Sequence, residues 1–169
     1  MKVVKQDFYS VKNPVIAIQA PLSGKIYPQE ESNNPLVKNQ LLGLGVEVEI
    51  SNYQLFAPFN GSLIAVKNAG LEFIFKSKAG LKLLVKIHLD EQNLPMTGFK
   101  SHVRPQAQLT AGELVASFDF RSAITPPKAS ITLLEHNKLS KLLNACYYQA
   151  SRVTAPSDTL FKLTKRTQQ

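Results

Sequence analysis

The chain contains no tryptophan, a single cysteine and no long apolar run. Cys146, standing alone, cannot form a disulfide framework or a cysteine-based zinc site, and it suits a reducing compartment. Near the N-terminus the only uninterrupted apolar run is 15–18, and Asp7 lies where an export signal would need hydrocarbon. No stretch approaches the roughly 20 apolar residues that cross a bilayer. The sequence therefore predicts a cytoplasmic protein.

The 169 residues are 44% hydrophobic, which is enough for one packed core. We expect a single domain over residues 15–165, with an N-terminal tail at 1–14 and a C-terminal tail at 166–169. On a helical wheel Val4, Phe8 and Val11 share one side, a basic amphipathic pattern that would suit a membrane surface. The short length and β-branched content favour a disordered or strand-like tail.

The net charge of +8 raises nucleic acid and anionic lipid as partners, because clustered basic residues displace counterions from phosphate polymers. Most of the lysines are spread along the chain, which argues against nucleic acid. One segment, 67–86, has five lysines against one acidic residue, Glu72. We call these lysines the basic patch: Lys67, Lys76, Lys78, Lys82 and Lys86. Attraction to a membrane surface through this patch or the N-terminal tail stays open.

Alternation of apolar and polar residues predicts β-strands almost throughout. In 46–50 three apolar residues alternate with Glu47 and Glu49, and 71–76 and 81–90 show the same period of two. Helical spacing occurs in one short segment, Glu135 to Asn144, where leucines recur at three and four residues. The prediction is an all-β chain with at most short helices.

The chain also repeats itself. Ala20-Pro21-Leu22-Ser23-Gly24-Lys25-Ile26 returns 37 residues later as Ala57-Pro58-Phe59-Asn60-Gly61-Ser62-Leu63. Proline fixes an extended entry and glycine allows a sharp turn, so each copy predicts a strand corner. Two such units indicate an antiparallel β-sandwich or barrel, a duplicated barrel-sandwich hybrid. Biotin and lipoate carriers share such patterns, but the Met-Lys-Met signature that they need is absent.

In order and spacing, these residues resemble the glucose-type IIA component of the bacterial phosphoenolpyruvate-dependent sugar phosphotransferase system. The resemblance covers about 18–165. It rests on Ala20–Gly24, Gly43-Leu44-Gly45-Val46, Phe56–Gly61, Gly80 with Leu83-Leu84-Val85, Leu89-Asp90, Leu94, Gly98-Phe99-Lys100, Leu109, Gly112-Glu113, Phe118-Asp119 and Val153-Thr154. The family relays a phosphoryl group from a small carrier protein to a membrane sugar permease. Its fold is a β-sandwich, in agreement with the repeat.

The resemblance implies that the family's phosphoryl site is altered in this chain. Lys86 stands where the family has the histidine that takes the phosphoryl group, six residues after Gly80. Leu71 stands at the second histidine, and Ala69 at a threonine found in many members. We expect Lys86 and Leu71 to face each other across adjacent strands, with the ammonium turned toward solvent or Asp90. The site face is predicted to include Phe73, Leu84, Lys86, His88 and Asp90.

His88 is the one candidate for a relocated phosphoryl acceptor. It lies two residues beyond Lys86 on the same strand face, about 6.6 Å along the strand, and reacting atoms must come within about 3.5 Å. A half-exposed histidine paired with Asp90 or Glu91 is the alternative interpretation. His102 and His136 lie too far along the chain to complete a zinc site with His88. No metal and no cofactor is expected.

Three functional hypotheses follow. The first is a IIA-family protein that has lost phosphoryl transfer, is not catalytically active, and acts as a regulatory or binding module with a protein partner on the former phosphoryl-site face. The second is a phosphocarrier in sugar uptake that uses His88. The third is a module that binds polyanions or membrane surfaces through the basic patch. In the family the docking face has an acidic rim that receives a basic carrier, and lysines in that region would oppose this encounter.

Overall fold

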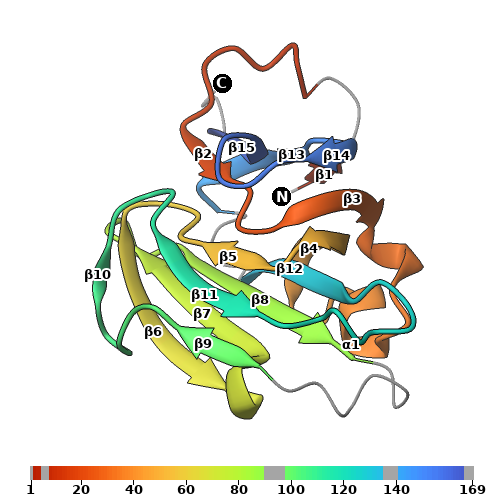
Figure 1. Ribbon diagram of the computed structural model, residues 1–169. Helices are drawn as coiled ribbons and strands as arrows, with labels where there is room; N and C mark the ends of the chain where they lie inside the picture. Colours follow the sequence, from red (N-terminus) through yellow and green to blue (C-terminus); the bar gives the residue numbers. More distant parts are fainter. Residues whose placement is uncertain (1, 5–7, 90–97, 135–140, 166–169) are drawn as a thin grey trace.

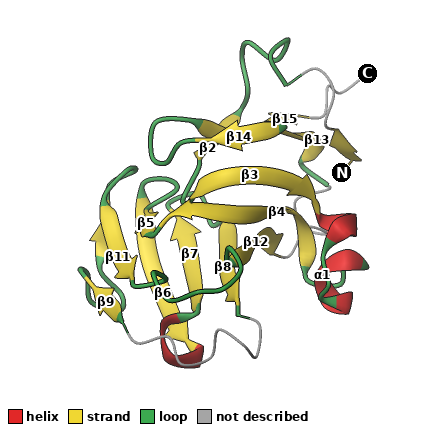
Figure 2. Ribbon diagram, turned by 45° about the vertical axis from the view of Figure 1, so that its right-hand side comes forward, coloured by secondary structure: helices red, strands yellow, loops and turns green. Residues whose placement is uncertain are grey.

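The computed structural model describes residues 2–4, 8–89, 98–134 and 141–165. They form three sheets arranged in layers, with helical turns only at the edges (Figures 1 and 2). The helical pieces are η1 (Gln29–Glu31), α1 (Pro35–Lys38) and η2 (Asn68–Gly70). None of the described helices is long and apolar enough to cross a membrane.

The largest sheet has eight strands and carries both predicted corners. In spatial order its strands are β10 (Gln108–Leu109), β6 (Gly61–Lys67), β7 (Glu72–Ser77), β8 (Lys82–His88), β12 (Lys128–Leu134), β4 (Gly43–Asn52), β3 (Ser23–Pro28) and β14 (Ser151–Val153). Every pairing in this sheet is antiparallel. The alternation in 46–50 and 71–76 therefore corresponds to two strands of this sheet, β4 and β7.

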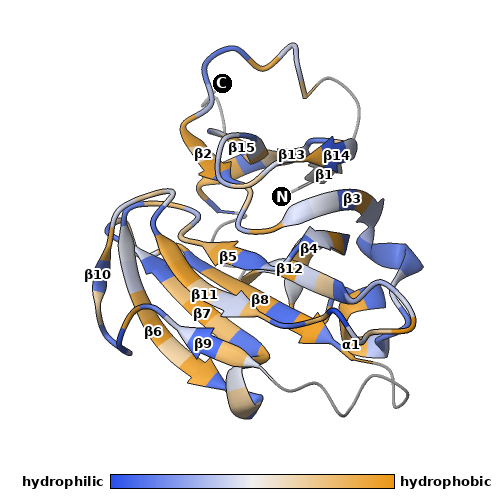
Figure 3. Cartoon of the chain, in the orientation of Figure 1, coloured by the Kyte–Doolittle hydropathy of each residue, from blue (hydrophilic) through white to orange (hydrophobic). Residues whose placement is uncertain are grey.

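Two smaller sheets complete the sandwich. One has β1 (Lys2–Val4), β13 (Leu143–Tyr148), β15 (Thr159–Lys165) and β2 (Ile16–Gln19), and the other has β5 (Gln54–Phe56), β11 (Leu114–Phe118) and β9 (Phe99–Ser101). One continuous cluster of buried apolar side chains joins all three sheets. Figure 3 shows apolar residues concentrated on β6, β7, β8 and β11, and polar residues at η1. The predicted all-β, mostly antiparallel fold is confirmed.

The two repeated corners occupy equivalent positions, as the 37-residue repeat predicts. Gln19 N donates to Pro58 O at 3.0 Å, and Phe56 N donates to Pro21 O at 2.9 Å. The donors Gln19 and Phe56 are 37 residues apart, and so are the acceptors Pro21 and Pro58. The two copies therefore contact each other reciprocally.

A second pair of hydrogen bonds extends this symmetry. Ser23 Oγ accepts from Ala155 N at 2.9 Å, and Asn60 Oδ1, 37 residues later, accepts from Ala111 N at 2.8 Å. Each corner thus uses one short polar side chain to satisfy a backbone amide of a distant loop. This confirms the prediction that the two corners are structurally equivalent.

The prediction of a helix over 135–144 is wrong for 141–144, the part of this segment that the structure describes. Residues 135–140 lie outside the described residues, 141–142 form a turn, and Leu143 begins β13. Leu142 is 68% exposed, whereas Leu143 is buried in the strand. Residues 143–148 pair with β15 as a strand, so tertiary contacts override the local spacing.

Part of the segment 1–14 belongs to the folded domain. Strand β1 pairs in parallel with β13, and Phe8 is only 5% exposed. Lys162 Nζ donates to Phe8 O and Val11 O, both at 3.0 Å, and lies 4.3 Å from the centre of the Phe8 ring. The aromatic ring that a membrane-binding helix would need is thus packed against β15. Residues 166–169 lie outside the described residues.

Candidate functional site

The outer face of β8 carries the residues that the resemblance singled out. Leu84, Lys86 and His88 alternate with core residues and therefore share one face of the strand. Lys86 Nζ lies 3.6 Å from Glu72 Oε1, and the two side chains are 30% and 17% exposed. Glu72 also accepts a hydrogen bond from the Asn68 side chain. Lys86, which the resemblance aligns with the family's phosphoryl acceptor, therefore forms a partly buried ion pair.

The expected pairing of Lys86 with Leu71 is wrong. In the β7–β8 register Glu72 stands opposite Lys86, while Leu71 O accepts from Ile87 N at 2.8 Å. The ammonium accordingly has a counter-charge that the sequence comparison did not anticipate. Ala69 lies just before, exposed and in a left-handed conformation with φ 53°.

Phe73 does not belong to the site face. It is opposite Val85 in the register and fully buried, so it points to the side of the sheet away from Lys86. Its ring contacts the rings of Phe99 and Phe118 with centroids 5.9 and 6.0 Å away. The prediction failed because strand alternation places Phe73 with the core. Asp90, also expected on the site face, lies outside the described residues.

His88 lies close to side chains of β12, which pairs with β8, and of β4, the next strand beyond β12. Its Nε2 lies 2.8 Å from Ser130 Oγ on β12 and 3.9 Å from Glu47 Oε1 on β4. Burial lowers the pKa of His88 below 6.5, the Lys86 charge lowers it further, and Glu72 raises it. The ring is therefore neutral at pH 7. His88 is a half-buried strand histidine, with Ser130 as its hydrogen-bond partner.

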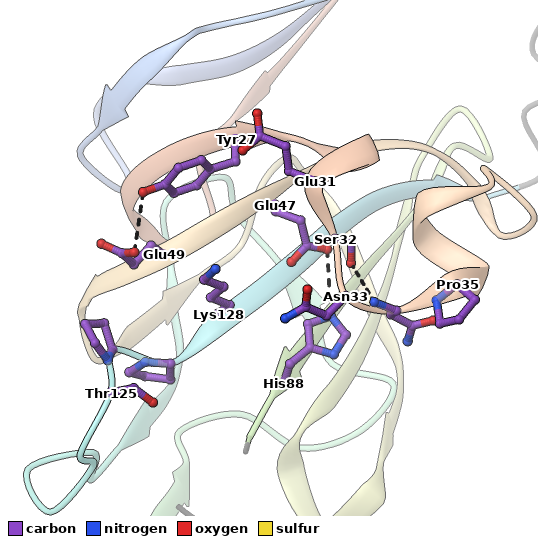
Figure 4. Close-up of a pocket in the computed structure, with 13 residues that line it drawn as sticks. Tyr27, Glu31, Ser32, Asn33, Pro35, Glu47, Glu49, His88, Thr125 and Lys128 are labelled. Atoms are coloured by element: carbon purple, nitrogen blue, oxygen red, sulfur yellow. Dashed lines mark hydrogen bonds and ion pairs between the residues drawn. The ribbon is translucent and has the colours of Figure 1, made fainter.

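Glu47 is the site residue that the sequence did not reveal. It reads as the polar member of an alternating strand, yet it is 4% exposed and its Oε1 has no hydrogen-bond partner. Burial raises the pKa of this carboxyl above 4.5, while the Ser32 hydroxyl and the Lys128 charge lower it. Figure 4 shows Glu47 reaching from β4 toward His88 beside Ser32.

The segment containing η1 and α1 covers Glu47. Gln29 anchors this segment through its buried side chain, because Nε2 donates to Val37 O at 2.8 Å and Oε1 accepts from Gly45 N. Asn34 caps α1 by accepting from Leu36 N. Nothing in the spacing of 29–38 predicts that this segment folds back over β4, which is why Glu47 was missed.

A cavity of about 700 Å³ opens between this segment and the loop that precedes β12 (Figure 4). Its lining includes Tyr27, Ser32, Glu47, His88 and Lys128. Among the residues described, no group of three or more His, Cys, Asp or Glu side chains could hold a metal ion. The cavity thus presents carboxylates, hydroxyls and one neutral imidazole.

The structure divides the basic patch in two. Lys76 and Lys82 stand directly opposite each other on β7 and β8, with Lys78 exposed in the connecting turn. Lys86 lies toward the other end of β8 and forms an ion pair with Glu72, and Lys67, the last residue of β6, is the register partner of Glu72. The other three lysines of the basic patch therefore lie at or next to the β7–β8 turn.

Comparisons with known proteins agree on the lineage. Residues 16–135 match the family model of the phosphoenolpyruvate-dependent sugar phosphotransferase system, EIIA 1. The chain is 26% identical over 148 residues to the glucose-specific EIIA component of Oceanobacillus iheyensis, covering 88% of this chain and 90% of that protein. It is 29% identical over 143 residues to the glucose-specific EIIBCA component of Corynebacterium glutamicum, covering 83% of this chain but only 21% of the relative.

A solved structure supports the fold independently. Glucose permease IIA from Mycoplasma capricolum superposes with a TM-score of 0.71 at 23% identity, covering 86% of this chain and 94% of that one. The family match extends from β2 to the end of β12 and includes both repeated corners and the whole β7–β8 hairpin. This chain belongs to the EIIA 1 family of the phosphoenolpyruvate-dependent sugar phosphotransferase system.

Proposed function

We propose that this EIIA-family protein carries no phosphoryl group and acts as a regulatory or binding module. The observation that carries the proposal is the Lys86–Glu72 ion pair at the position of the family's phosphoryl acceptor. An ammonium has no lone pair with which to attack phosphorus. Glu72 would also repel an incoming phosphoryl group.

His88 is a poor substitute for the missing acceptor. Its Nε2 faces Ser130 and lies 3.9 Å from the buried Glu47 carboxyl. A phosphoryl group on Nε2 would place two negative charges beside this carboxyl in a poorly hydrated site, where like charges repel strongly. This geometry favours the regulatory module over the relocated phosphocarrier.

The charge of the β7–β8 turn indicates the kind of partner. Lys76 and Lys78 are exposed at the end of β7 and in the β7–β8 turn, where their charge would attract an acidic protein surface and repel a basic one. We infer that the partner is an acidic protein of the phosphotransferase system or one regulated by it. Binding to anionic vesicles or nucleic acid that weakens steeply with salt would support the polyanion-binding alternative.

A phosphoryl relay tests the proposal. The chain is incubated with phosphoenolpyruvate and the two general carrier proteins of the system, and its intact mass is read under conditions that preserve acid-labile phosphate. The EIIA component of Oceanobacillus iheyensis serves as the positive control. We expect no phosphate on the wild type or on His88→Ala. Stoichiometric phosphorylation of the wild type that His88→Ala abolishes would establish the relocated carrier.

A further inference from the structure

The cavity beside His88 contains an unsatisfied buried acceptor. Glu47 is 96% buried, and no hydrogen-bond donor reaches its Oε1 in the described part of the chain. Leaving a buried acceptor without a donor destabilises a protein by about 1 to 3 kcal/mol, more when the acceptor is charged. Such an atom at a cavity wall indicates a donor that comes from outside the chain.

The neighbouring groups make this position selective for donors. His88 Nε2 is hydrogen-bonded to Ser130 Oγ at 2.8 Å and lies 3.9 Å from Glu47 Oε1, too far to satisfy that oxygen. Glu49 carries a further carboxylate on the same strand face, and its Oε2 accepts from the Tyr27 hydroxyl at 3.4 Å. A ligand that approaches these groups must itself supply hydrogen-bond donors.

The net charge of the side chains that line the cavity also favours a ligand with hydrogen-bond donors. Three carboxylates, from Glu31, Glu47 and Glu49, line the cavity against a single lysine, Lys128, giving a local charge of about −2 with His88 neutral. The whole chain, by contrast, carries +8. An acidic cavity in a basic protein favours a cationic ligand electrostatically. Its volume of about 700 Å³ is typical of small-molecule sites.

We propose that this cavity binds a small organic ligand through a primary ammonium group that donates a hydrogen bond to Glu47 Oε1. An ammonium has three N–H donors and one positive charge, so it can satisfy Oε1 and compensate the buried carboxylate together. A neutral hydroxyl supplies only one donor and no charge. Ligand binding is a separate property from the proposed loss of phosphoryl transfer, and neither requires the other.

Matched pairs of small molecules test the proposal by NMR. Ethanolamine and glucosamine are the ammonium probes, and ethylene glycol and glucose are their neutral counterparts. We expect saturable shifts of the Ser32 amide and the His88 ring with the amines, and binding at least tenfold weaker with the neutral molecules. Bound ammonium should also lower the pKa of the Glu47 carboxyl, followed by carbon NMR, because an opposite charge favours the ionised form.

Two variants make the test specific. Glu47→Gln keeps the size of the side chain and should weaken amine binding at least tenfold, whereas Glu30→Gln, at an exposed position outside the cavity lining, should change it less than threefold. Both variants must retain the wild-type circular dichroism spectrum. Equal binding of amines and neutral molecules, unchanged binding by Glu47→Gln, or no saturable shift with either amine would overturn the proposal. The relay assay described above is unaffected by any of these outcomes.

Discussion

Replacing Lys86 by glutamine should raise the pKa of the His88 imidazole. The two residues are neighbours on one face of β8, so their Cα atoms lie about 6.6 Å apart. At that separation two unit charges interact with about 0.6 kcal/mol in water and about 2.5 kcal/mol at an effective dielectric constant of 20. Because the Lys86 charge lowers the pKa of the partly buried His88, removing that charge should raise this pKa.

The titration is followed by proton–carbon NMR of the histidine rings, with the His102 ring, which contacts Ser117 of β11, as an internal control. Glu72→Gln is the matched variant, and it should move the His88 pKa in the opposite direction, because Glu72 raises that pKa in the wild type. Unchanged His88 titration in Lys86→Gln, or a shift to lower pH, would refute the electrostatic reasoning about this face.

Three further predictions follow from the fold and the site. In Gly24→Ala and Gly61→Ala the new Cβ would overlap a backbone carbonyl of the paired strand, so each variant should lose about 2 to 4 kcal/mol of unfolding free energy, measured in urea. Gly80→Ala is the control: its Cβ meets no atom within 4 Å, but its φ is +87°, so it should lose only about 1 kcal/mol. Because burial raises the pKa of the Glu47 carboxyl, the unfolding free energy of the wild type should fall relative to that of Glu47→Gln as the pH rises above 4.5, by at most about 1.4 kcal/mol per pH unit. A stability difference between the two proteins that stays constant over this pH range in thermal unfolding would contradict this prediction. The Cys146 thiol, whose pKa burial raises to about 12, should resist iodoacetamide at pH 8 until the protein unfolds, and rapid alkylation of the native chain would show that β13 opens.

Local periodicity predicted the parts of the fold that depend on one strand at a time. The alternation around Val46 and Phe75 identifies β4 and β7 because side chains of a half-buried strand must alternate between core and solvent. The same logic placed Lys86 and His88 on one face of β8. It failed for Leu143, because what makes 143–148 a strand is pairing with β15, which lies some 20 residues away in sequence.

The residue of β7 that stands opposite Lys86 can be predicted only from the geometry of the β7–β8 turn. Ser77 N donates to Leu81 O, and Gly80 N donates to Ser77 O, closing a short hairpin in which Gly80 adopts a positive φ. Counting outward from this turn pairs Glu72 with Lys86. Hairpin geometry applied to 77–81 could therefore have revealed the ion pair, whereas a comparison of aligned positions could not.

The burial of Glu47 was beyond the reach of sequence patterns. Its strand alternates regularly, and the covering segment has no periodic signal. Only the buried Gln29 side chain, which ties 29–38 to β4, turns an apparently exposed carboxylate into a buried one.

The phosphate content of the chain after a complete phosphoryl relay tests the central claim most directly. The chain, phosphoenolpyruvate and the general carrier proteins are brought to equilibrium, and acid-labile phosphate per chain is quantified against an active EIIA component in the same mixture. With Lys86 ion-paired to Glu72 and His88 facing Glu47, we predict that the chain takes up no phosphate while the active component is fully labelled. One acid-labile phosphate per chain would contradict the account.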